Sequence, residues 1–266
     1  MRTRTHHSLL AAGLLAFPVA ILAQDQTLLT ETFSYAAGNL TAVSNGGWIA
    51  HSGAGSNPVQ VNASAAAVLR GGSAEDVNWT LSPTPLTTGS LLASFTLDLS
   101  SGTLASSGVS TYFLHFKDGT TGFRARVFLG SADVADTDLF RLGIENDGGD
   151  GATTISYSAN LDRTAPHQVT VAYDLSAGTS KLWINAPLTG PATVEDAVAA
   201  APLGMVGVAL RQGGSAATTG NYSGLQVDNL TVTYSPAVVP EPTTWALGIA
   251  GLGVMGWSVR RRMASR

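Results

Sequence analysis

The chain has 266 residues, no cysteine, and only 12% charged residues. Between Gln24 and Ser235 it carries 17 acidic and 8 basic residues, a net charge of −9. Such an acidic body argues against nucleic acid as a partner, because phosphate binding needs a basic surface. Without cysteine no disulfide can hold the fold, so a packed apolar core must do so alone.

Residues 1–23 are typical of a signal peptide. Arg2 and Arg4 form a basic start, Leu9 to Leu22 form an apolar run, and Ala23 supplies a small residue at the expected cleavage site. The alternative is a membrane anchor, which is disfavoured because a helix needs about 20 apolar residues to cross a bilayer. We therefore expect a signal helix that directs export and is then removed.

Residues 24–235 are predicted to form one all-β domain. Apolar and polar residues alternate with a period of two, which is the pattern of strands with one buried face. The clearest runs are 90–99, 123–130, 167–175, 205–212 and 225–234. In the run 123–130, alternation places Phe123, Ala125, Val127 and Leu129 on the buried face and Arg124 and Arg126 together on the other face. Counting such runs predicts about 11 to 13 short strands.

Turn sequences separate these runs. KDGTTG at 117–122 and DLSAGTSK at 174–181 each predict a hairpin, and the glycine-rich stretch 145–151 predicts a tight or bulged turn. The strongest helical candidate is 193–201, where Thr193 could cap the first turn. No repeat of fixed period is present, which argues against a propeller or a solenoid.

An antiparallel sandwich is the economical way to bury so many half-apolar strands. The segments FRLGIEND, VTVAYDLSAGTSKLWINAP, VGVALRQG and YSGLQVDNLTVT resemble concanavalin-A-like and laminin-G-like jelly-roll domains of bacterial exported proteins. The matching residues are Phe140, Arg141, Leu142, Gly143, Tyr173, Trp183, Asn185, Arg211, Asp228 and Leu230. This resemblance spans Glu31 to Tyr234 and implies an antiparallel jelly-roll β-sandwich. It does not choose a function, since such folds host lectins, glycan-binding modules, glycoside hydrolases and adhesion domains.

The C-terminal segment divides into three parts. Residues 236–244 contain Pro240, Glu241 and Pro242 and are predicted to be an extended linker, because proline continues neither a helix nor a central strand. Residues 245–259 are uncharged and predict a short transmembrane helix. The basic tail 260–266, which begins with Arg260, Arg261 and Arg262, then stays in the cytoplasm by the positive-inside rule.

The order of a Pro-Glu-Pro triplet, an apolar helix and an arginine cluster resembles the PEP-CTERM sorting signal. The resemblance implies recognition by an exosortase of a Gram-negative bacterium after transport by the secretion machinery. The helix would cross the inner membrane transiently and be removed near the triplet, and the body would reach the cell surface or the exopolysaccharide matrix. The alternative is an ordinary C-terminal membrane anchor that stays attached.

One acidic cluster is a candidate for chemistry. Glu145, Asp147 and Asp150 lie close together in sequence and run into Gly148 and Gly149. A solvated turn is the favoured interpretation, and no cofactor is expected. The alternatives are a calcium site built from these carboxylates and a catalytic carboxylate pair of a glycoside hydrolase.

The histidines do not predict catalysis or zinc binding. His51, His115 and His167 lack metal-ligand spacing, and no G-x-S-x-G elbow is present. His115 alternates with Phe113 on the face opposite Tyr112, and we expect a structural histidine with satisfied hydrogen bonds.

Glycan binding is a second candidate role of the body, since sugar sites on sandwiches combine an exposed aromatic ring with planar polar groups. The candidate residues are Trp183, Arg124, Arg126, Arg141 and Arg211. In the alternative, these arginines pair with nearby acids and Trp183 packs beneath a loop.

The sequence therefore predicts an exported, non-enzymatic protein of the cell surface or the biofilm matrix. Its expected partners are the exosortase, the secretion machinery and extracellular polysaccharide, with no nucleic acid. The alternatives are a lectin-like module with a defined carbohydrate ligand and a glycoside hydrolase.

Overall fold

The computed structural model describes residues 24–72, 74–105, 109–146, 155–196, 198–213 and 222–237, and residues 24–237 form one compact unit. The predicted signal peptide, the Pro-Glu-Pro triplet, the membrane helix and the basic tail lie outside the described residues. Within the described part of the chain, no helix has the length and apolar character needed to span a membrane.

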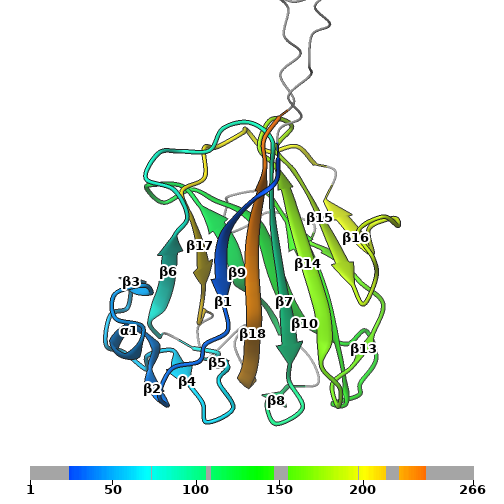
Figure 1. Cartoon of the computed structure of the whole chain (residues 1–266). Coiled ribbons are helices and arrows are strands. Elements are labelled where there is room, and N and C mark those ends of the chain that lie inside the picture. The colour runs from blue at the N-terminus through cyan, green and yellow to red at the C-terminus, as the bar shows by residue number, and fades with distance from the viewer. Residues whose placement is uncertain are drawn as a thin grey trace, which may run out of the picture. The chain divides into compact units, whose positions relative to one another are not determined.

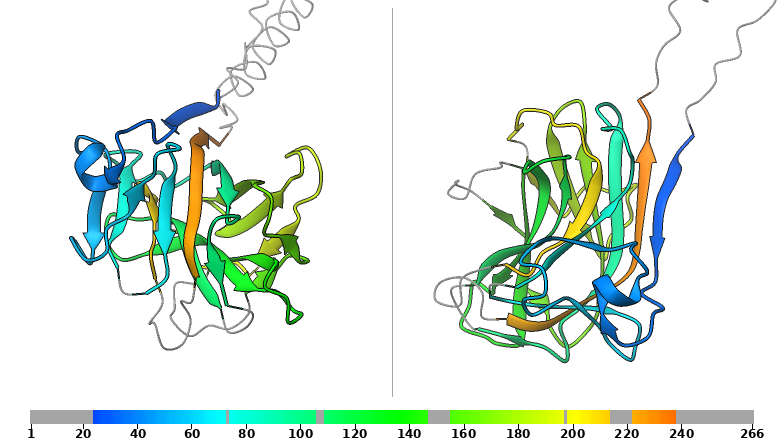
Figure 2. Two further views of the ribbon diagram at one scale, coloured as in Figure 1. Left: turned by 90° about the horizontal axis from the view of Figure 1, so that it is seen from below. Right: turned by 90° about the vertical axis from the view of Figure 1, so that its left-hand side faces the viewer.

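Two antiparallel sheets packed face to face make up the unit, which confirms the predicted all-β sandwich and is consistent with a jelly roll (Figures 1 and 2). In the described residues the first sheet has ten strands in the order β16-β15-β14-β7-β18-β5-β4-β2, with β1 and β8 also paired to β18. These strands are β1 (Gln26–Glu31), β2 (Gly38–Asn39), β4 (Gln60–Val61), β5 (Ala67–Arg70), β7 (Ser90–Asp98), β8 (Thr103–Leu104), β14 (His167–Asp174), β15 (Thr179–Ile184), β16 (Val194–Asp196) and β18 (Tyr222–Ser235).

The second sheet has eight strands in the described residues, in the order β12-β11-β10-β9-β17-β6-β3, with β13 also paired to β11. They are β3 (Ile49–Ser52), β6 (Asp76–Thr80), β9 (Ser110–Lys117), β10 (Phe123–Ser131), β11 (Leu139–Glu145), β12 (Ser156–Tyr157), β13 (Leu161–Asp162) and β17 (Gly207–Leu210). The only helix of the described residues is α1 (Leu40–Val43), beside β2 and β3 in Figure 1.

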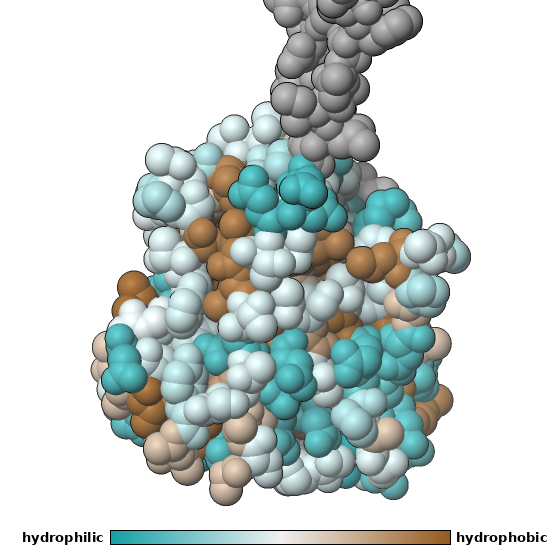
Figure 3. All heavy atoms as spheres, in the orientation of Figure 1, coloured by the Kyte–Doolittle hydropathy of each residue, from teal (hydrophilic) through white to brown (hydrophobic). Residues whose placement is uncertain are grey.

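The alternating runs form strands as predicted. In β7 the side chains of Leu91, Phe95 and Leu97 are buried in the core, while their neighbours are only half-buried. The outer face of this sheet, seen from the front in Figure 3, accordingly mixes hydrophilic and hydrophobic side chains. The described residues form eighteen strands, more than the roughly 11 to 13 predicted, and five of them are only two residues long.

Both predicted hairpins are confirmed. The turn between β9 and β10 closes on Asp118, whose carboxylate accepts the backbone N–H groups of Thr120 (2.7 Å) and Gly122 (2.9 Å). The turn between β14 and β15 uses Gly178 at φ +70°, a conformation that glycine adopts without strain.

The helical candidate at 193–201 is wrong. Val194–Asp196 is instead strand β16, which pairs with β15 at the edge of the first sheet. A weak cap and a run of alanines give local helix propensity only, and backbone pairing with an adjacent strand outweighs it.

The second sheet differs from the first because its central strands are buried on both faces. Nearly every residue of β9, β10 and β17 is buried, whereas burial alternates along β7 and β14. Several of these buried residues, including Tyr112, His115 and Phe128, do not belong to the apolar core. They therefore lie on the outer face of the second sheet, where they are recessed.

The segment between β1 and β3 is held by the carboxylate of Glu31, which is 5% exposed. It accepts hydrogen bonds from the Phe33 backbone N–H (2.6 Å), the Tyr35 hydroxyl (2.7 Å) and Trp48 Nε1 (2.9 Å). Burial and the bond to this carboxylate raise the pKa of Tyr35, which therefore remains a donor. A buried charge is tolerated when it has such partners, and these bonds fix the segment that leads into β3.

Candidate ligand pocket on the second sheet

A pocket of about 300 Å³ lies on the outer face of the second sheet. Its volume is at the lower end of the range found for small-molecule sites. It is lined by residues of β3, β6, β9 and β10, the turn after β9 and the segment after β17: His51, Ser52, Asp76, Tyr112, His115, Lys117, Thr120, Thr121, Phe123 and Arg211. Its aromatic lining residues Tyr112 and Phe123 are not part of the apolar core between the sheets, so the pocket lies outside that core.

An irregular register brings the aromatic residues of the pocket together. Leu114 pairs with Val127 and Tyr112 pairs with Phe128, so Phe113 is skipped in the ladder between β9 and β10. Such a bulge changes the side on which the following side chains project. Tyr112 and His115 consequently share a face, with ring centroids 5.4 Å apart, although simple alternation placed them on opposite faces.

Phe123 joins the same group of rings. Its centroid lies 4.5 Å from that of His115, and it is half-buried at the start of β10 rather than in the core, where alternation with Val127 had placed it. The register of β10 shifts between Arg124 and Val127, and Ala125 adopts φ +51°. This irregularity turns Phe123 to the outer face.

His115 is a buried polar group of the pocket. It is 0% exposed, and neither ring nitrogen has a hydrogen-bond partner among the described residues. The expectation of a satisfied structural histidine is therefore wrong. Burial lowers the pKa of His115 well below its ordinary value, and the nearby His51 and Arg211 lower it further, so the ring is neutral at neutral pH.

His51 lies beside His115, with ring centroids 6.1 Å apart. Its Nδ1 atom likewise lacks a hydrogen-bond partner within the described residues. Burial lowers the pKa of His51; Asp76 opposes this shift, whereas Lys117 and Arg211 add to it. Both histidines are therefore neutral groups that can donate or accept a hydrogen bond.

Two cations face the pocket. The guanidinium of Arg211 lies 4.1 Å from the ring centroid of Tyr112, a cation–π contact. Lys117 lies at the end of β9, and its Nζ donates to the carbonyl of Asp118 at 2.9 Å. The carboxylate of Asp76 also lines the pocket, and its two oxygens accept hydrogen bonds from Ser52 Oγ and the backbone N–H of the residue after Arg211, each at 2.8 Å.

Gln212 positions the segment that carries Arg211. Its side chain is almost fully buried, and its Oε1 accepts the Arg70 backbone N–H at 2.9 Å. Its Nε2 donates to the carbonyls of Asn57 (2.8 Å) and Glu75 (3.0 Å). Arg211 is therefore held beside a residue that links three separate parts of the chain.

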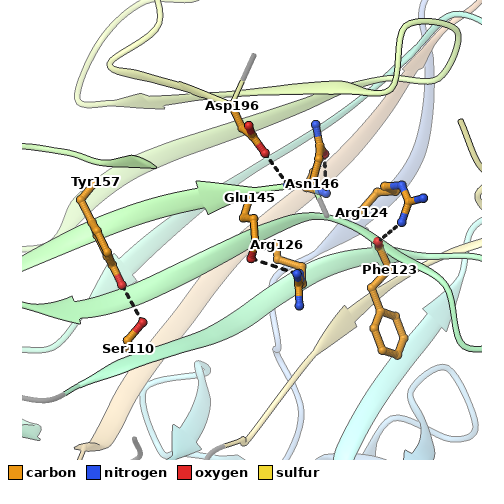
Figure 4. A network of polar contacts seen from close by, with 9 residues as sticks. Ser110, Phe123, Arg124, Arg126, Glu145, Asn146, Tyr157 and Asp196 are labelled. Atoms are coloured by element: carbon orange, nitrogen blue, oxygen red, sulfur yellow. Dashed lines mark hydrogen bonds and ion pairs between the residues drawn. The ribbon is translucent and has the colours of Figure 1, made fainter. Parts of the chain in front are cut away.

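Arg126, one of the predicted glycan-binding residues, reaches the outer face of the second sheet. It lies 5.1 Å from the ring centroid of Tyr112 and also forms a buried ion pair with Glu145 at 2.9 Å (Figure 4). Glu145 is 4% exposed, so the expectation that it belongs to a solvated turn is wrong for this residue. Its position at the end of β11, opposite Arg126 in register, explains the burial.

Arg124 lies apart from Arg126. It donates to the carbonyls of Phe123 and Ala201, each at 2.8 Å, and is 7% exposed. Figure 4 shows its side chain and the Phe123 ring leaving the strand on opposite sides. The irregular backbone at Ala125 breaks the alternation that predicted a shared face for the two arginines.

The structure does not bring Arg141 and Trp183 to the pocket. The Arg141 guanidinium lies 4.8 Å from the Tyr157 ring centroid, and its Nε donates to the Ser131 carbonyl at 3.0 Å. Trp183 belongs to the first sheet, is 9% exposed, and donates from Nε1 to the carbonyl of Gly190 at 3.1 Å. Trp183 is therefore covered by the loop that follows β15, as in the alternative to glycan binding, and is not an exposed aromatic.

The calcium alternative stays a prediction, because Asp147 and Asp150 lie outside the described residues. Next to Glu145, the Asn146 backbone N–H donates to Asp196 at 2.6 Å (Figure 4).

Sequence reasoning missed most of the pocket. His51, Asp76 and Lys117 were not predicted as neighbours, because they come from three different strands and are far apart in the chain. Arg211 was named, both as a candidate for glycan binding and among the residues that carry the jelly-roll resemblance. The remaining contacts depend on pairing between distant strands, which no local spacing reveals.

Comparison with known proteins places a PEP-CTERM protein-sorting motif at residues 238–262. No curated protein gives a significant match. Among solved structures, the CBM2 module of the evolved Dit of Lactobacillus casei BL23 phage J-1 is similar, with 10% identity, coverage of 83% of this chain and 100% of that chain, and a TM-score of 0.53. A legume lectin-like domain from Entamoeba histolytica (11% identity, 79% and 97% coverage, TM-score 0.45) and an alginate lyase from Alteromonas sp. 272 (12%, 73% and 98%, TM-score 0.45) are more distant.

The fold and the tail together define an all-β sandwich protein that is addressed for export. The chain carries the PEP-CTERM sorting signal at its C-terminal end, as the order of triplet, apolar run and arginines had indicated. The structural similarity concerns the fold alone.

Proposed function

We propose that this protein is exported to the cell surface or extracellular matrix, where its β-sandwich body binds polysaccharide without cleaving it. The observation that carries the proposal is the pocket on the second sheet, which combines recessed rings with hydrogen-bonding groups on a protein that bears an export signal.

The chemistry of the pocket suits a sugar. The half-exposed ring of Phe123 offers an apolar surface for the C–H face of a pyranose. Around it lie the hydroxyl groups of Thr120 and Thr121, the His51 ring and the planar guanidinium of Arg211. Ligand sites typically combine an apolar wall with a few placed polar groups in this way.

Binding without cleavage is favoured by the carboxylates near the pocket. Most glycoside hydrolases use a pair of carboxyl groups on either side of the scissile bond. Among the described lining residues Asp76 is the one carboxylate, and both its oxygens accept hydrogen bonds. Glu145, the residue considered for a hydrolase, is held in the ion pair with Arg126.

The route to the surface follows from the sorting motif. We propose that an exosortase of a Gram-negative bacterium removes the helix at 245–259 near Pro240, Glu241 and Pro242 after a transient stay in the inner membrane. Arg260, Arg261 and Arg262 hold the end of the chain in the cytoplasm until then. The released body then contacts the exopolysaccharide of the matrix.

Affinity gel electrophoresis of residues 24–237 tests the binding proposal. This unit contains the whole described core and is expected to fold by itself. Gels containing neutral or acidic polysaccharides should retard the wild type, and Phe123→Ala should abolish the retardation. Tyr234→Ala, which shortens a half-buried aromatic of the first sheet, is the matched control and should leave it unchanged.

Two results would contradict the proposal. Absence of retardation by every polysaccharide would exclude glycan binding by the body. Equal retardation of the wild type and a folded Phe123→Ala variant, with thermal unfolding as the check on folding, would place the site elsewhere.

A further inference from the structure

We propose that the pocket selects an acidic polysaccharide, and that Lys117 and Arg211 bind a carboxylate carried by one of its sugar residues. The inference rests on the proposed polysaccharide binding and specifies the class of ligand.

The first argument is the distribution of charge. The body has a net charge of −9, yet two of its eight basic residues line a single small pocket. Within the described residues Arg126, Arg163 and Lys181 each form an ion pair with a carboxylate. Lys117 and Arg211 form none within 4.0 Å, which is also true of Arg70, Arg124 and Arg141, but only Lys117 and Arg211 among these five line the pocket. Two cations that share a recess repel each other, and a bound anion relieves that repulsion.

The second argument is that Asp76 offsets only one of these two positive charges. Its oxygens are directed to Ser52 and to the backbone N–H of Gln212. The pocket therefore keeps a net positive charge among its described lining residues when both histidines are neutral. An anionic ligand is attracted to such a locally positive pocket, and the acidic residues elsewhere on the body disfavour its binding outside the pocket.

The third argument is geometric. The guanidinium of Arg211 is stacked on Tyr112 at 4.1 Å, and Gln212 fixes the backbone beside it. A planar guanidinium held in place matches the two oxygens of a carboxylate better than a flexible ammonium does. Lys117 supplies a second positive charge at the edge of the pocket. This pairing suits an oxyanion on a sugar, and the carboxylate of a uronic acid is such a group.

Proton uptake on binding follows from the same arrangement. Charged and titratable residues of four elements surround His51 and His115. They are Asp76 of β6, Tyr112 and Lys117 of β9, Arg126 of β10, and Arg211 in the segment after β17. A bound carboxylate adds a negative charge that favours the protonated form of His51. Affinity for an acidic polysaccharide should therefore increase as the pH falls from 7.5 to 5.5, and His51→Gln should remove much of the increase.

Binding of residues 24–237 to three polyuronates of different linkage tests the inference by calorimetry. The probes are polygalacturonate, hyaluronate and alginate, each compared with its carboxyl-reduced, neutral form, and dextran sulfate is compared with dextran. We expect binding to at least one polyuronate and loss of binding on carboxyl reduction.

Binding measurements on variants test whether Lys117 and Arg211 are the cations that bind the carboxylate. Lys117→Gln and Arg211→Gln should each weaken binding about tenfold, since a charged hydrogen bond contributes on the order of that factor. Arg211→Lys keeps the charge but loses the planar fork, so it should weaken binding less. Lys181→Gln, which removes a positive charge from the first sheet, is the matched control and should bind as the wild type does.

The outcomes separate this inference from the proposed function. If a carboxyl-reduced polysaccharide binds as tightly as its acidic form, the carboxylate is not the group that the pocket recognises, and the inference is overturned. The proposed polysaccharide binding would still stand. Binding of dextran sulfate without any polyuronate would replace the carboxylate by a sulfate and overturn the inference. Wild-type affinity in the folded Lys117→Gln and Arg211→Gln variants would overturn the assigned cations. Absence of binding to all probes, charged and neutral, would overturn both proposals.

Discussion

His115 occupies a position where an apolar residue would serve the fold better. The ring is enclosed by Tyr112, Phe123 and His51, and its two nitrogens have no partner among the described residues. An unsatisfied buried polar group costs about 1–3 kcal/mol. Local rules of stability are commonly broken at functional sites, and this agrees with a role of the pocket in binding.

His115→Phe should therefore raise the free energy of unfolding by about 1–2 kcal/mol at pH 7.5. Phenylalanine fills a similar volume beside the neighbouring rings without a polar atom. Urea unfolding of residues 24–237 measures the change, and a variant less stable than the wild type would contradict this view of His115.

The same variant should also alter the pH dependence of stability. Burial lowers the pKa of His115, so below about pH 6.5 the unfolded chain binds a proton that the folded chain does not. Stability is therefore complete above that pH and decreases as the pH falls toward the lower pKa of the folded state. His115→Phe should lessen the decrease between pH 7 and 5, and part of it remains because the pKa of His51 is lowered too. An unchanged slope would show that His115 does not titrate in this range.

At the scale of single residues, the sequence shows which residue types are present but not the face of the sheet from which each side chain projects. Alternation placed Tyr112 opposite His115 and placed Phe123 in the core, and both assignments are wrong. The cause is the irregular pairing of β9 with β10. A bulge depends on two strands at once, so the alternation within either strand cannot predict it.

At the scale of the elements, the segment after β17 matters for the pocket because it carries Arg211, which lines the pocket. It is short and irregular, but Gln212 within it bonds to the backbone at Asn57, Arg70 and Glu75. The alternating run 205–212 indicated a strand but gave Gln212 no role. Gln212 is important because it bonds to residues more than 130 positions away in the chain. Local sequence propensity cannot predict such contacts.

Gln212→Ala should lower the free energy of unfolding by about 2–4 kcal/mol, because it leaves buried backbone groups without partners. Polysaccharide binding should weaken as well, since Arg211 loses its support. Gln168→Ala is the matched control: Gln168 is exposed on β14 and bonds to Thr96, and its loss should have little effect. Equal stability of the two variants, measured by thermal and urea unfolding, would refute the role given to Gln212.

At the scale of the whole molecule, the sandwich could be predicted because the apolar residues of β7 and β14 alternate over their full lengths. The hollowed outer face of the second sheet could not be predicted. There both faces are buried, and a continuous buried run does not show which side faces the core. The pocket thus arises where the periodic signal is weakest.

The two ends of the body lie together. β1 pairs antiparallel with β18, and Gln26 is opposite Tyr234, so the described chain enters and leaves at one end of the first sheet (Figure 1). The pocket belongs to the second sheet. A precursor held through its C-terminal segment is therefore attached by the sheet that does not carry the pocket.

The intact mass and the cell fraction of the mature protein in its own host test the central claim most directly. We predict a mass that lacks residues 1–23 and everything after about Pro242, in protein recovered outside the inner membrane. Glu241→Ala in the sorting triplet should block this processing and leave the precursor in the membrane. A wild-type protein that retains Trp245 to Arg266 and remains in the inner membrane would show a permanent anchor and contradict sorting to the surface.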